Sequence, residues 1–185
     1  RFGLEKQQVE RLTLDIQCGE ITEENILTLQ KEIKYSKKIY YYIIEKQEEG
    51  YGILNKAIEG ITIYSEKEDK VYLVKDMTKL KNIFENKDIV KIGYKQKKDY
   101  ILLKQIGIQT KNLMFDIEIA GYLLNSNINK YTLEYLSEEY LKLDVTTYLK
   151  NTEPEQKQLT LFEQYENKEN TISKKNYIYA YLIYK

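Results

Sequence analysis

Carboxylates are the side chains of this sequence with which catalytic chemistry could be built. The chain has 185 residues and no histidine, whereas Ser-His-Asp sites, Cys-His sites and His-ligated zinc sites all require an imidazole. Its single cysteine, Cys18, cannot form an intrachain disulfide. No signal-peptide pattern or long apolar run is present in the sequence, so we expect a cytoplasmic protein that does not enter a membrane. What remains is metal-dependent carboxylate chemistry or no chemistry.

The composition argues against general electrostatic attraction to nucleic acid. Lys+Arg and Asp+Glu both number 29, so the chain lacks the net positive field that collects polyanions. Any contact with DNA is therefore expected to be local and weak. Nineteen tyrosines without a tryptophan could stack on unpaired bases, but tyrosines in such numbers also serve at the edges of a core.

One Asp-x-Glu pair, Asp116 and Glu118, attracts attention as a candidate metal site. It stands at the junction between a short apolar run and the segment IEIAGYLL. Aspartate is a favoured N-cap, and acidic residues favour the first turn of a helix. We therefore interpret the two acids as the cap and first turn of a helix.

Hydrophobic periodicity predicts the elements that position the carboxylates. A helix is expected over 22–36, with Thr22 as its N-cap and apolar residues every three to four positions. Three strands rich in β-branched and aromatic residues follow, at 38–45, 59–66 and 70–74. Their short connections predict an antiparallel meander.

Helices and strands then alternate along the chain. We expect a helix capped by Asp76, a strand at 88–94, a helix at 97–107 ended by Gly107 and a short strand at 112–116. Parallel neighbours need a helical crossover. The order therefore predicts an α/β fold with a mixed sheet, a three-stranded meander plus two further strands, and helices on both faces.

The domain organisation follows from the same pattern. Residues 1–36 are predicted to be an N-terminal linker with a helical segment, and residues 37–185 to form one domain. Within that domain, residues 150–172 are polar and are expected to form a loop, before a last helix that begins near Ser173 or Asn176. The sequence starts without Met and ends inside a helical pattern, so we expect it to be a piece of a longer chain.

Two stretches resemble the proofreading exonuclease-type domain of bacterial DNA polymerase I. They are KIGYKQKKD, from Lys91, and MFDIEIAGYLLNS, which ends at Ser126. The similarity covers roughly residues 38–149 and resumes at 173–185. It implies a ribonuclease H-like fold, a polymerase domain in the same chain as partner, a monomer, and a part in DNA replication and repair.

The resemblance also implies where a metal site would lie. Such exonucleases hold two divalent cations about 4 Å apart with four carboxylates. The first two acids form an Asp-x-Glu on the first strand, and here the matching positions are Ile43 and Glu45. The third acid matches Asp99. The fourth matches Tyr181, four residues after the water-orienting position, Tyr177. Two of four acids therefore remain.

Three lysines, Lys95, Lys97 and Lys98, stand beside Asp99 in the sequence. Our hypothesis is that one of these ammonium groups pairs with Glu45 or Asp99 and occupies the charge role of the missing cations. The same three lysines are the candidates for a weak contact with DNA.

The expected function is that of a degenerate, catalytically inactive 3′-5′ exonuclease-like domain, which needs no cofactor and positions or supports its polymerase. The stretch IIEKQEEGY resembles family members that have lost proofreading. One alternative is an active, Mg²⁺-dependent exonuclease in which Glu45, Asp99 and an acid such as Glu163 or Glu166 rebuild the site. A second alternative is a module that binds single-stranded nucleic acid through tyrosines and lysines.

Overall fold

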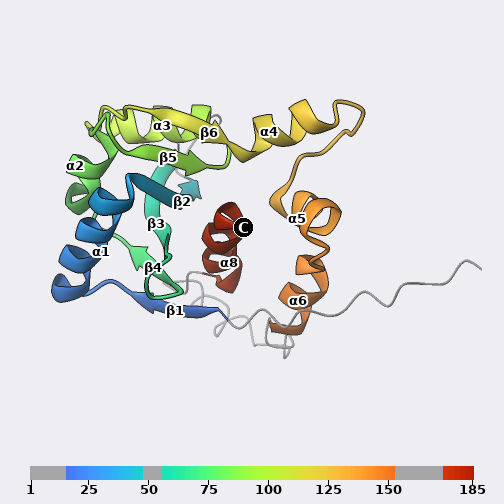
Figure 1. The fold of residues 1–185 in the computed structure, drawn as a ribbon, viewed down its shortest axis with the longest axis horizontal. Helices are drawn as coiled ribbons and strands as arrows, with labels where there is room; N and C mark the ends of the chain where they lie inside the picture. Colours follow the sequence, from blue (N-terminus) through green and yellow to red (C-terminus); the bar gives the residue numbers. More distant parts are fainter. Residues whose placement is uncertain (1–15, 48–55, 153–172) are drawn as a thin grey trace, which may run out of the picture.

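A six-stranded mixed sheet organises the computed structural model, which describes residues 16–47, 56–152 and 173–185. The strand order is β1-β4-β3-β2-β5-β6, and Figure 1 shows the sheet with helices on both sides. The strands are β1 Gln17–Glu20, β2 Lys38–Gln47, β3 Lys56–Ser65, β4 Lys70–Val74, β5 Val90–Gly93 and β6 Leu113–Asp116.

The helices alternate with these strands as the sequence pattern predicted. They are α1 Glu23–Ser36, the 3₁₀ helix η2 Met77–Leu80, α2 Lys81–Phe84, α3 Gln96–Gln105, α4 Ile117–Leu124, α5 Leu133–Leu141, α6 Val145–Thr152 and α8 Lys174–Tyr184. Several boundaries are set by capping side chains. The hydroxyl of Thr22 accepts from the Asn25 backbone N–H, and the Asp76 carboxylate accepts from that of Thr78.

The topology confirms the predicted meander and adds one strand to the predicted five. β2 pairs antiparallel with β3, and β3 pairs antiparallel with β4. β5 lies parallel to β2, and β6 lies parallel to β5, as expected for strands joined by helices. The additional strand, β1, pairs parallel with β4. It was missed because its four residues, QCGE, carry no run of β-branched or aromatic side chains.

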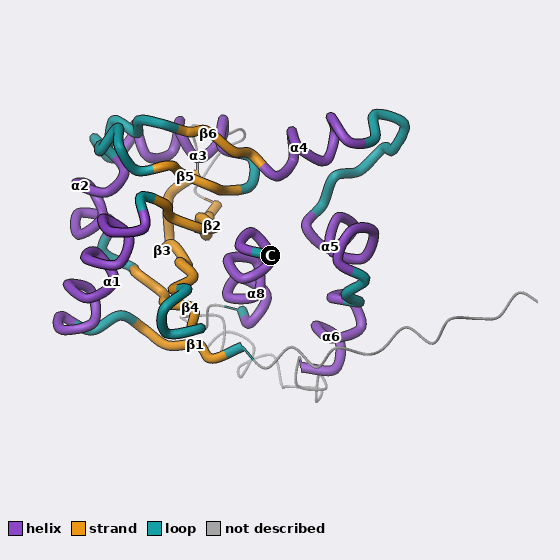
Figure 2. Tube along the Cα trace, viewed as in Figure 1, coloured by secondary structure: helices purple, strands orange, loops and turns teal. Residues whose placement is uncertain are grey.

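The sheet separates two cores, and β2 contributes to both because its side chains alternate between the faces. One core holds Tyr41 and Ile43 together with side chains of α1, α2 and α3. On the opposite face, Tyr40 and Tyr42 pack with side chains of α8. Figure 2 shows α1 and α2 on one side of the strands, with α8, α5 and α6 on the other.

Part of the segment predicted to be an N-terminal linker packs into the first core. Ile26, Leu29 and Ile33 of α1 are almost completely buried there. Residues 16–36 are thus integrated with the sheet, because α1 has an apolar stripe that only a neighbouring surface can cover. The rest of the predicted linker, and most of the predicted polar loop (residues 153–172), lie outside the described residues. In the part of the chain that the structure describes, no helix is long and apolar enough to cross a bilayer.

Candidate functional site

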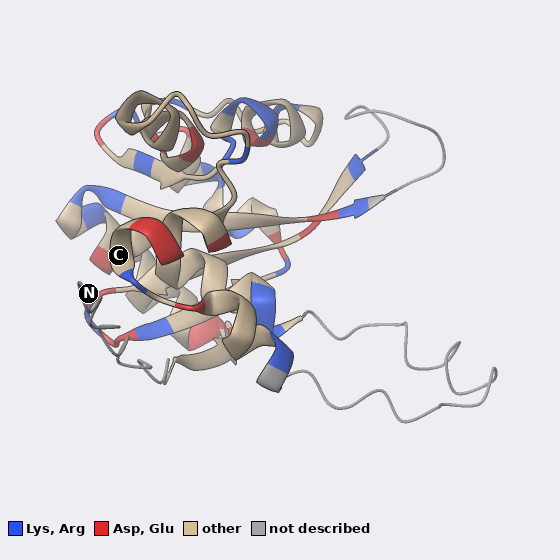
Figure 3. Cartoon of the chain, turned by 90° about the vertical axis from the view of Figure 1, so that its right-hand side faces the viewer, with Lys and Arg blue, Asp and Glu red and all other residues tan. Residues whose placement is uncertain are grey.

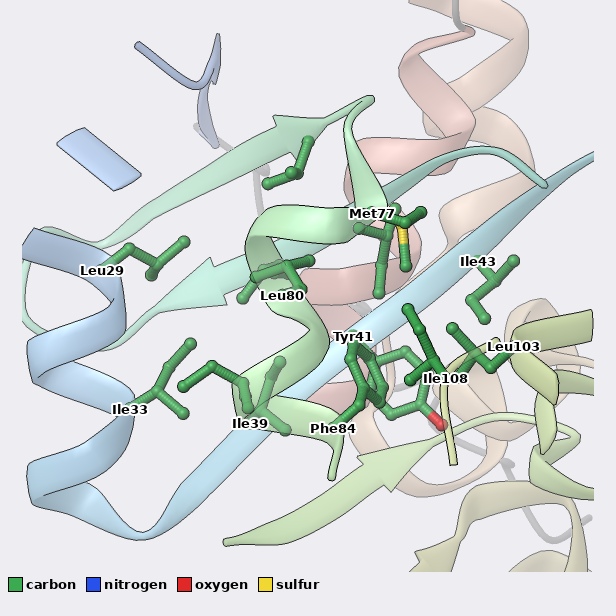
Figure 4. Close-up of a cluster of buried hydrophobic side chains, with 14 of the residues drawn as sticks. Leu29, Ile33, Ile39, Tyr41, Ile43, Met77, Leu80, Phe84, Leu103 and Ile108 are labelled. Atoms are coloured by element: carbon green, nitrogen blue, oxygen red, sulfur yellow. The ribbon is translucent and has the colours of Figure 1, made fainter. Parts of the chain in front are cut away.

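The first of the four candidate positions, Ile43, lies in the hydrophobic core. Its side chain is 1% exposed and belongs to the cluster that includes Tyr41, Leu103 and Ile108. Figure 4 shows Ile43 among these side chains. An aliphatic group in this place provides no oxygen ligand for a hard cation.

The second position, Glu45, is bound by two lysines. β2 has a register irregularity between Ile44 and Glu45, and beyond it the Glu45 carboxylate accepts hydrogen bonds from Lys98 of α3 and Lys56 of β3. Burial disfavours the charged form, but the two ammonium groups outweigh it, so the pKa of Glu45 lies below its ordinary value.

This arrangement confirms that one of the three lysines near Asp99 pairs with a surviving acid. Lys98 is that lysine, and its partner is Glu45. The second cation, Lys56, was not foreseen. The predicted antiparallel pairing could have indicated it, because β3 begins opposite the end of β2 and Lys56 pairs with Gln47, two residues after Glu45.

The third position, Asp99, is almost completely buried. It lies in the first turn of α3, and its residue is 1% exposed. Burial raises its pKa to about 8; the Lys98 ammonium opposes this shift and the Glu45 carboxylate adds to it. Burial thus favours the protonated form of Asp99. Its Oδ2 atom is buried without a hydrogen-bond partner among the described residues.

Tyr41 is the neighbour of Asp99 that sequence reasoning missed. Its hydroxyl is fully buried and, within the described ranges, also lacks a well-formed hydrogen bond. Burial first, and then the adjacent Asp99 carboxyl, raise the pKa of Tyr41. The ring fits because position 93 is a glycine: a Cβ there would lie 2.9 Å from the tyrosine Cζ atom. Since Tyr41 precedes Ile43 by two residues, strand alternation was the signal for it.

Asp116 caps two helices, as the capping interpretation predicted for one of them. Its Oδ1 atom accepts from the backbone N–H of Glu118, 2.9 Å away, at the start of α4. Its two oxygens also accept from the N–H groups of Lys95 (3.2 Å) and Gln96 (2.7 Å) at the start of α3. Glu118 pairs with the Lys95 ammonium at 3.6 Å. Both acids thus interact with the N-terminal ends of helices, where negative charge is favourable.

The α8 positions lie on the other face of the sheet. The Tyr181 ring contacts Tyr64 with centroids 5.6 Å apart. Tyr64 pairs with Tyr40, which precedes Glu45 by five residues, or about 16 Å along a strand. Tyr177 lines a groove near β1. The structure therefore brings Glu45, Asp99 and Lys98 together, but does not bring Tyr177 or Tyr181 to them.

A different α8 residue, Tyr179, packs against β2. Its ring packs edge-on against Tyr42, with centroids 4.8 Å apart, and its hydroxyl donates to Glu134 of α5. Lys175 also pairs with Glu134 at 2.9 Å. Burial opposes ionisation of Glu134, but these donors keep its pKa below the ordinary value. This acid is thus bound within its own polar cluster.

The residues that the structure describes do not fit a two-cation site. Glu45 accepts from two ammonium groups, Asp99 has a raised pKa that favours its protonated form, and the other two positions are Ile43 and Tyr181. Among the described residues, no three His, Cys, Asp or Glu side chains are grouped so that they could hold a metal ion. Divalent cations such as Mg²⁺ require several ionised or neutral oxygen ligands around one point.

Comparison with known sequences gives one family match and a polymerase relative. The family described as DNA polymerase I, ribonuclease H-like domain, matches residues 42–148. DNA polymerase I of Borreliella burgdorferi is 37% identical over 94 residues, which are 50% of this chain and 10% of that protein. The chain thus aligns with about a tenth of the length of this curated relative.

Solved structures share the fold at low sequence identity. Trypanosoma brucei RNase D superposes with a TM-score of 0.65 at 12% identity, covering 92% of this chain and 62% of that one. Escherichia coli RNase D, an exoribonuclease, superposes with a TM-score of 0.62 at 12% identity, covering 91% of this chain and 43% of that one. The POL domain of Pol1 from M. smegmatis superposes with a TM-score of 0.56 at 16% identity, covering 67% of this chain and 22% of that one. These similarities confirm the predicted ribonuclease H-like α/β fold.

Proposed function

The chain belongs to the family of DNA polymerase I ribonuclease H-like domains, and we propose that it is a catalytically inactive member with a structural role in a DNA-directed DNA polymerase. In this role the domain supports the polymerase part of its own chain, as a monomeric cytoplasmic protein in DNA replication and repair. It contacts DNA weakly or only through its neighbour.

The observation that carries the proposal is the state of the two surviving acids. An exonuclease of this kind needs ionised carboxylates to hold its cations. Here Glu45 is ionised but its oxygens accept from Lys56 and Lys98. Asp99 keeps its proton at neutral pH because it is buried. Ammonium groups and a proton thus supply the positive charge that the active relatives obtain from metal ions, without their Lewis acidity.

The main rival is an active exonuclease with a rebuilt carboxylate set. Its candidate acids, Glu163 and Glu166, lie outside the described residues. A cation held by Glu45 and either of these acids would have to displace the Lys56 and Lys98 ammonium groups from Glu45, and Asp99 would have to release its proton to solvent before it could act as a ligand. The lysine contacts and the raised pKa therefore weigh against this rival.

The second rival, a module for single-stranded nucleic acid, needs tyrosine rings that are accessible to bases. Tyr64 is largely buried, and stacks on Tyr184 with centroids 4.3 Å apart. Tyr40 and Tyr181 pack edge-on against this pair. Figure 3 shows basic and acidic segments interspersed over the elements, which is unlike the basic groove of such modules. These four rings therefore pack on one another rather than forming an open stacking surface, and together with the scattered charges this favours the structural role.

A nuclease assay tests the proposal. The purified chain is incubated with 3′-labelled single-stranded DNA and either Mg²⁺ or Mn²⁺, beside a Glu45→Ala, Asp99→Ala double variant. We expect no release of nucleotides above the double-variant background with either metal. Metal-dependent release that the double variant abolishes would show a working site and overturn the proposal.

A filter-binding measurement on the same preparations separates the second rival. We expect an affinity for single-stranded DNA too weak to measure at physiological salt. A tight, salt-sensitive affinity without cleavage would instead identify a nucleic-acid-binding module.

A further inference from the structure

The helix α4 has apolar side chains on every side. Its sequence, IEIAGYLL, contains one charged residue, Glu118. A helix that is apolar all round is normally buried all round. In α4, however, Gly121 is the only buried residue, and Figure 1 shows the helix extending beyond the edge of the sheet.

Exposed apolar side chains are concentrated on this segment. Six of the eleven exposed large hydrophobic side chains in the described ranges lie between positions 114 and 124: Met114, Phe115, Ile119, Tyr122, Leu123 and Leu124. Leu123 is 76% exposed and Leu124 is 70% exposed. Ile119, Tyr122 and Leu123 have the spacing that places side chains on one outer face of a helix. A cluster of this kind marks an interaction surface.

A groove continues this surface on the other side of α4. It has a volume of about 240 Å³ and runs between α4, α5 and the end of α8. Its lining is almost wholly apolar and includes Phe115, Leu124, Leu136 and Leu182. We call the exposed side of α4 and this groove together the α4 surface.

The same surface adjoins an open edge of the sheet. β6 is the last strand in the order, so within the described residues it has a strand neighbour on one side alone, β5. Unpaired strand edges beside exposed apolar side chains are normally covered by other protein.

The length of the relatives indicates what covers the α4 surface. The matching polymerase from Borreliella burgdorferi is about ten times longer than the aligned segment. A polymerase part that is joined covalently to this domain has a high effective concentration at the surfaces that it can reach.

We infer that the α4 surface is the docking site for the polymerase part of the same chain, which inserts apolar side chains into the groove. This inference rests on the proposed function, because it names the partner that the inactive domain supports. The chemistry of the surface fits a protein partner: Lys185 is the one charged residue in the lining of the groove, whereas DNA phosphates require several cations.

Two charge insertions test the assignment in the full-length polymerase. Leu123→Glu and Leu124→Glu change exposed side chains of α4, so both variants should fold. Leu27→Glu is the matched control, because Leu27 is 58% exposed on α1, which packs on the opposite face of the sheet. Amide hydrogen exchange is measured on α4 in the isolated domain and in the full-length chain. The domain is also titrated with the separately produced remainder of the chain.

We expect α4 to exchange at least tenfold more slowly in the full-length chain than in the isolated domain. Leu123→Glu and Leu124→Glu should each weaken association with the remainder at least tenfold, and Leu27→Glu should leave it unchanged. Equal exchange in the two forms, or equal weakening by the control, would overturn the assignment. So would a dimer of the isolated domain that Leu123→Glu disrupts, since the surface would then bind a second copy.

The docking site and the proposed inactivity can fail separately. Association that the α4 variants leave unchanged, together with an absence of nuclease activity, would refute the docking site and leave the inactive domain in place. Metal-dependent nuclease activity with docking intact would refute the inactive role and leave the docking site in place.

Discussion

Glu45 and Asp99 are neighbouring carboxyl groups in the structure, and the protein reduces the repulsion between them in two opposite ways. Glu45, at the end of β2, keeps its charge and receives hydrogen bonds from two ammonium groups. Asp99, in the first turn of α3, is almost completely buried and keeps its proton instead. Glu45 therefore has a lowered pKa and Asp99 a raised one. A carboxylate pair can therefore be accommodated in a fold by cations at one member and by protonation at the other.

The comparison predicts opposite dependences of stability on pH. A buried acid with a raised pKa destabilises the folded state once it ionises, whereas an acid held by cations stabilises the folded state while it is ionised. If both acids were instead poised to bind metal, both would stay ionised at neutral pH. The expectations below separate these cases.

The largest expected effect is that of Asp99→Asn. The pKa of Asp99 rises from 3.8 to about 8 on folding, so the folded state binds more protons between these values and stability falls as pH rises. Asparagine removes this penalty. Relative to that of the variant, the free energy of unfolding of the wild type should fall by up to about 1.4 kcal/mol for each pH unit between about pH 4 and 8. The difference should be constant above that window, and urea denaturation at a series of pH values would measure it.

Asp99→Ala is the control for this experiment, since it removes the charge but also leaves a cavity. Its stability should depend on pH in the same way as that of Asp99→Asn, but should be lower than that of Asp99→Asn at every pH. A wild-type stability that rises between pH 4 and 8 relative to Asp99→Asn would contradict the protonated state. Stabilisation of the wild type by millimolar Mg²⁺ would also contradict it.

A smaller effect is expected at Ile43, two residues before Glu45 in β2. Ile43→Asp would restore the Asp-x-Glu pattern of the family, but it places a carboxylate at a site that is 1% exposed. It should lower the free energy of unfolding by about 3 kcal/mol or more at neutral pH, from lost apolar burial and an uncompensated charge. Chemical denaturation followed by circular dichroism is the measurement.

Ile43→Val is its matched control and should cost about 1 kcal/mol. Restored metal-dependent nuclease activity in Ile43→Asp, without loss of stability, would show that the position faces a cation site rather than the core. Position 43 would then count, with Glu45 and Asp99, as a third position able to supply a metal ligand.

The sequence pattern predicted much of the fold because the strands of the meander and the helices after them have strong periodicity and clear caps. Thr22 and Asp76 cap helices in the structure, and Gly107 has the positive φ that a chain reversal needs. β1 was missed because pairing with β4, rather than local preference, makes it a strand.

The candidate site was predicted less completely than the fold. The resemblance to the family pointed to Glu45 and Asp99, and the lysine that pairs with Glu45 in the structure, Lys98, is one of the three lysines noted beside Asp99. The resemblance could not show that Asp99 is buried against Tyr41, because burial depends on how α3 packs on the sheet. Nor could it show that Tyr181 faces Tyr64, since the rotation of α8 is decided by packing against β2, β3 and β4.

The smallest expected effect concerns the pair formed by Glu45 and Lys98. A double-mutant cycle with Glu45→Gln and Lys98→Met should give a coupling energy of about 1 kcal/mol at pH 7, since the two side chains are 17% and 21% exposed. The folded pKa of Glu45 is lowered from 4.5, so this stabilisation is complete above that value. It should be lost as the pH falls through the lowered pKa.

The same cycle with Asp99→Asn in place of Glu45→Gln sharpens the contrast between the two acids. At neutral pH Asp99 is protonated, so its coupling to Lys98 should be close to zero and should grow only as the pH rises above about 8. A coupling of equal size for both acids at pH 7 would mean that Lys98 is shared between two ionised carboxylates. In that case the two acids would not differ in charge, and a cation that displaces Lys98 would have a ready pair of ligands.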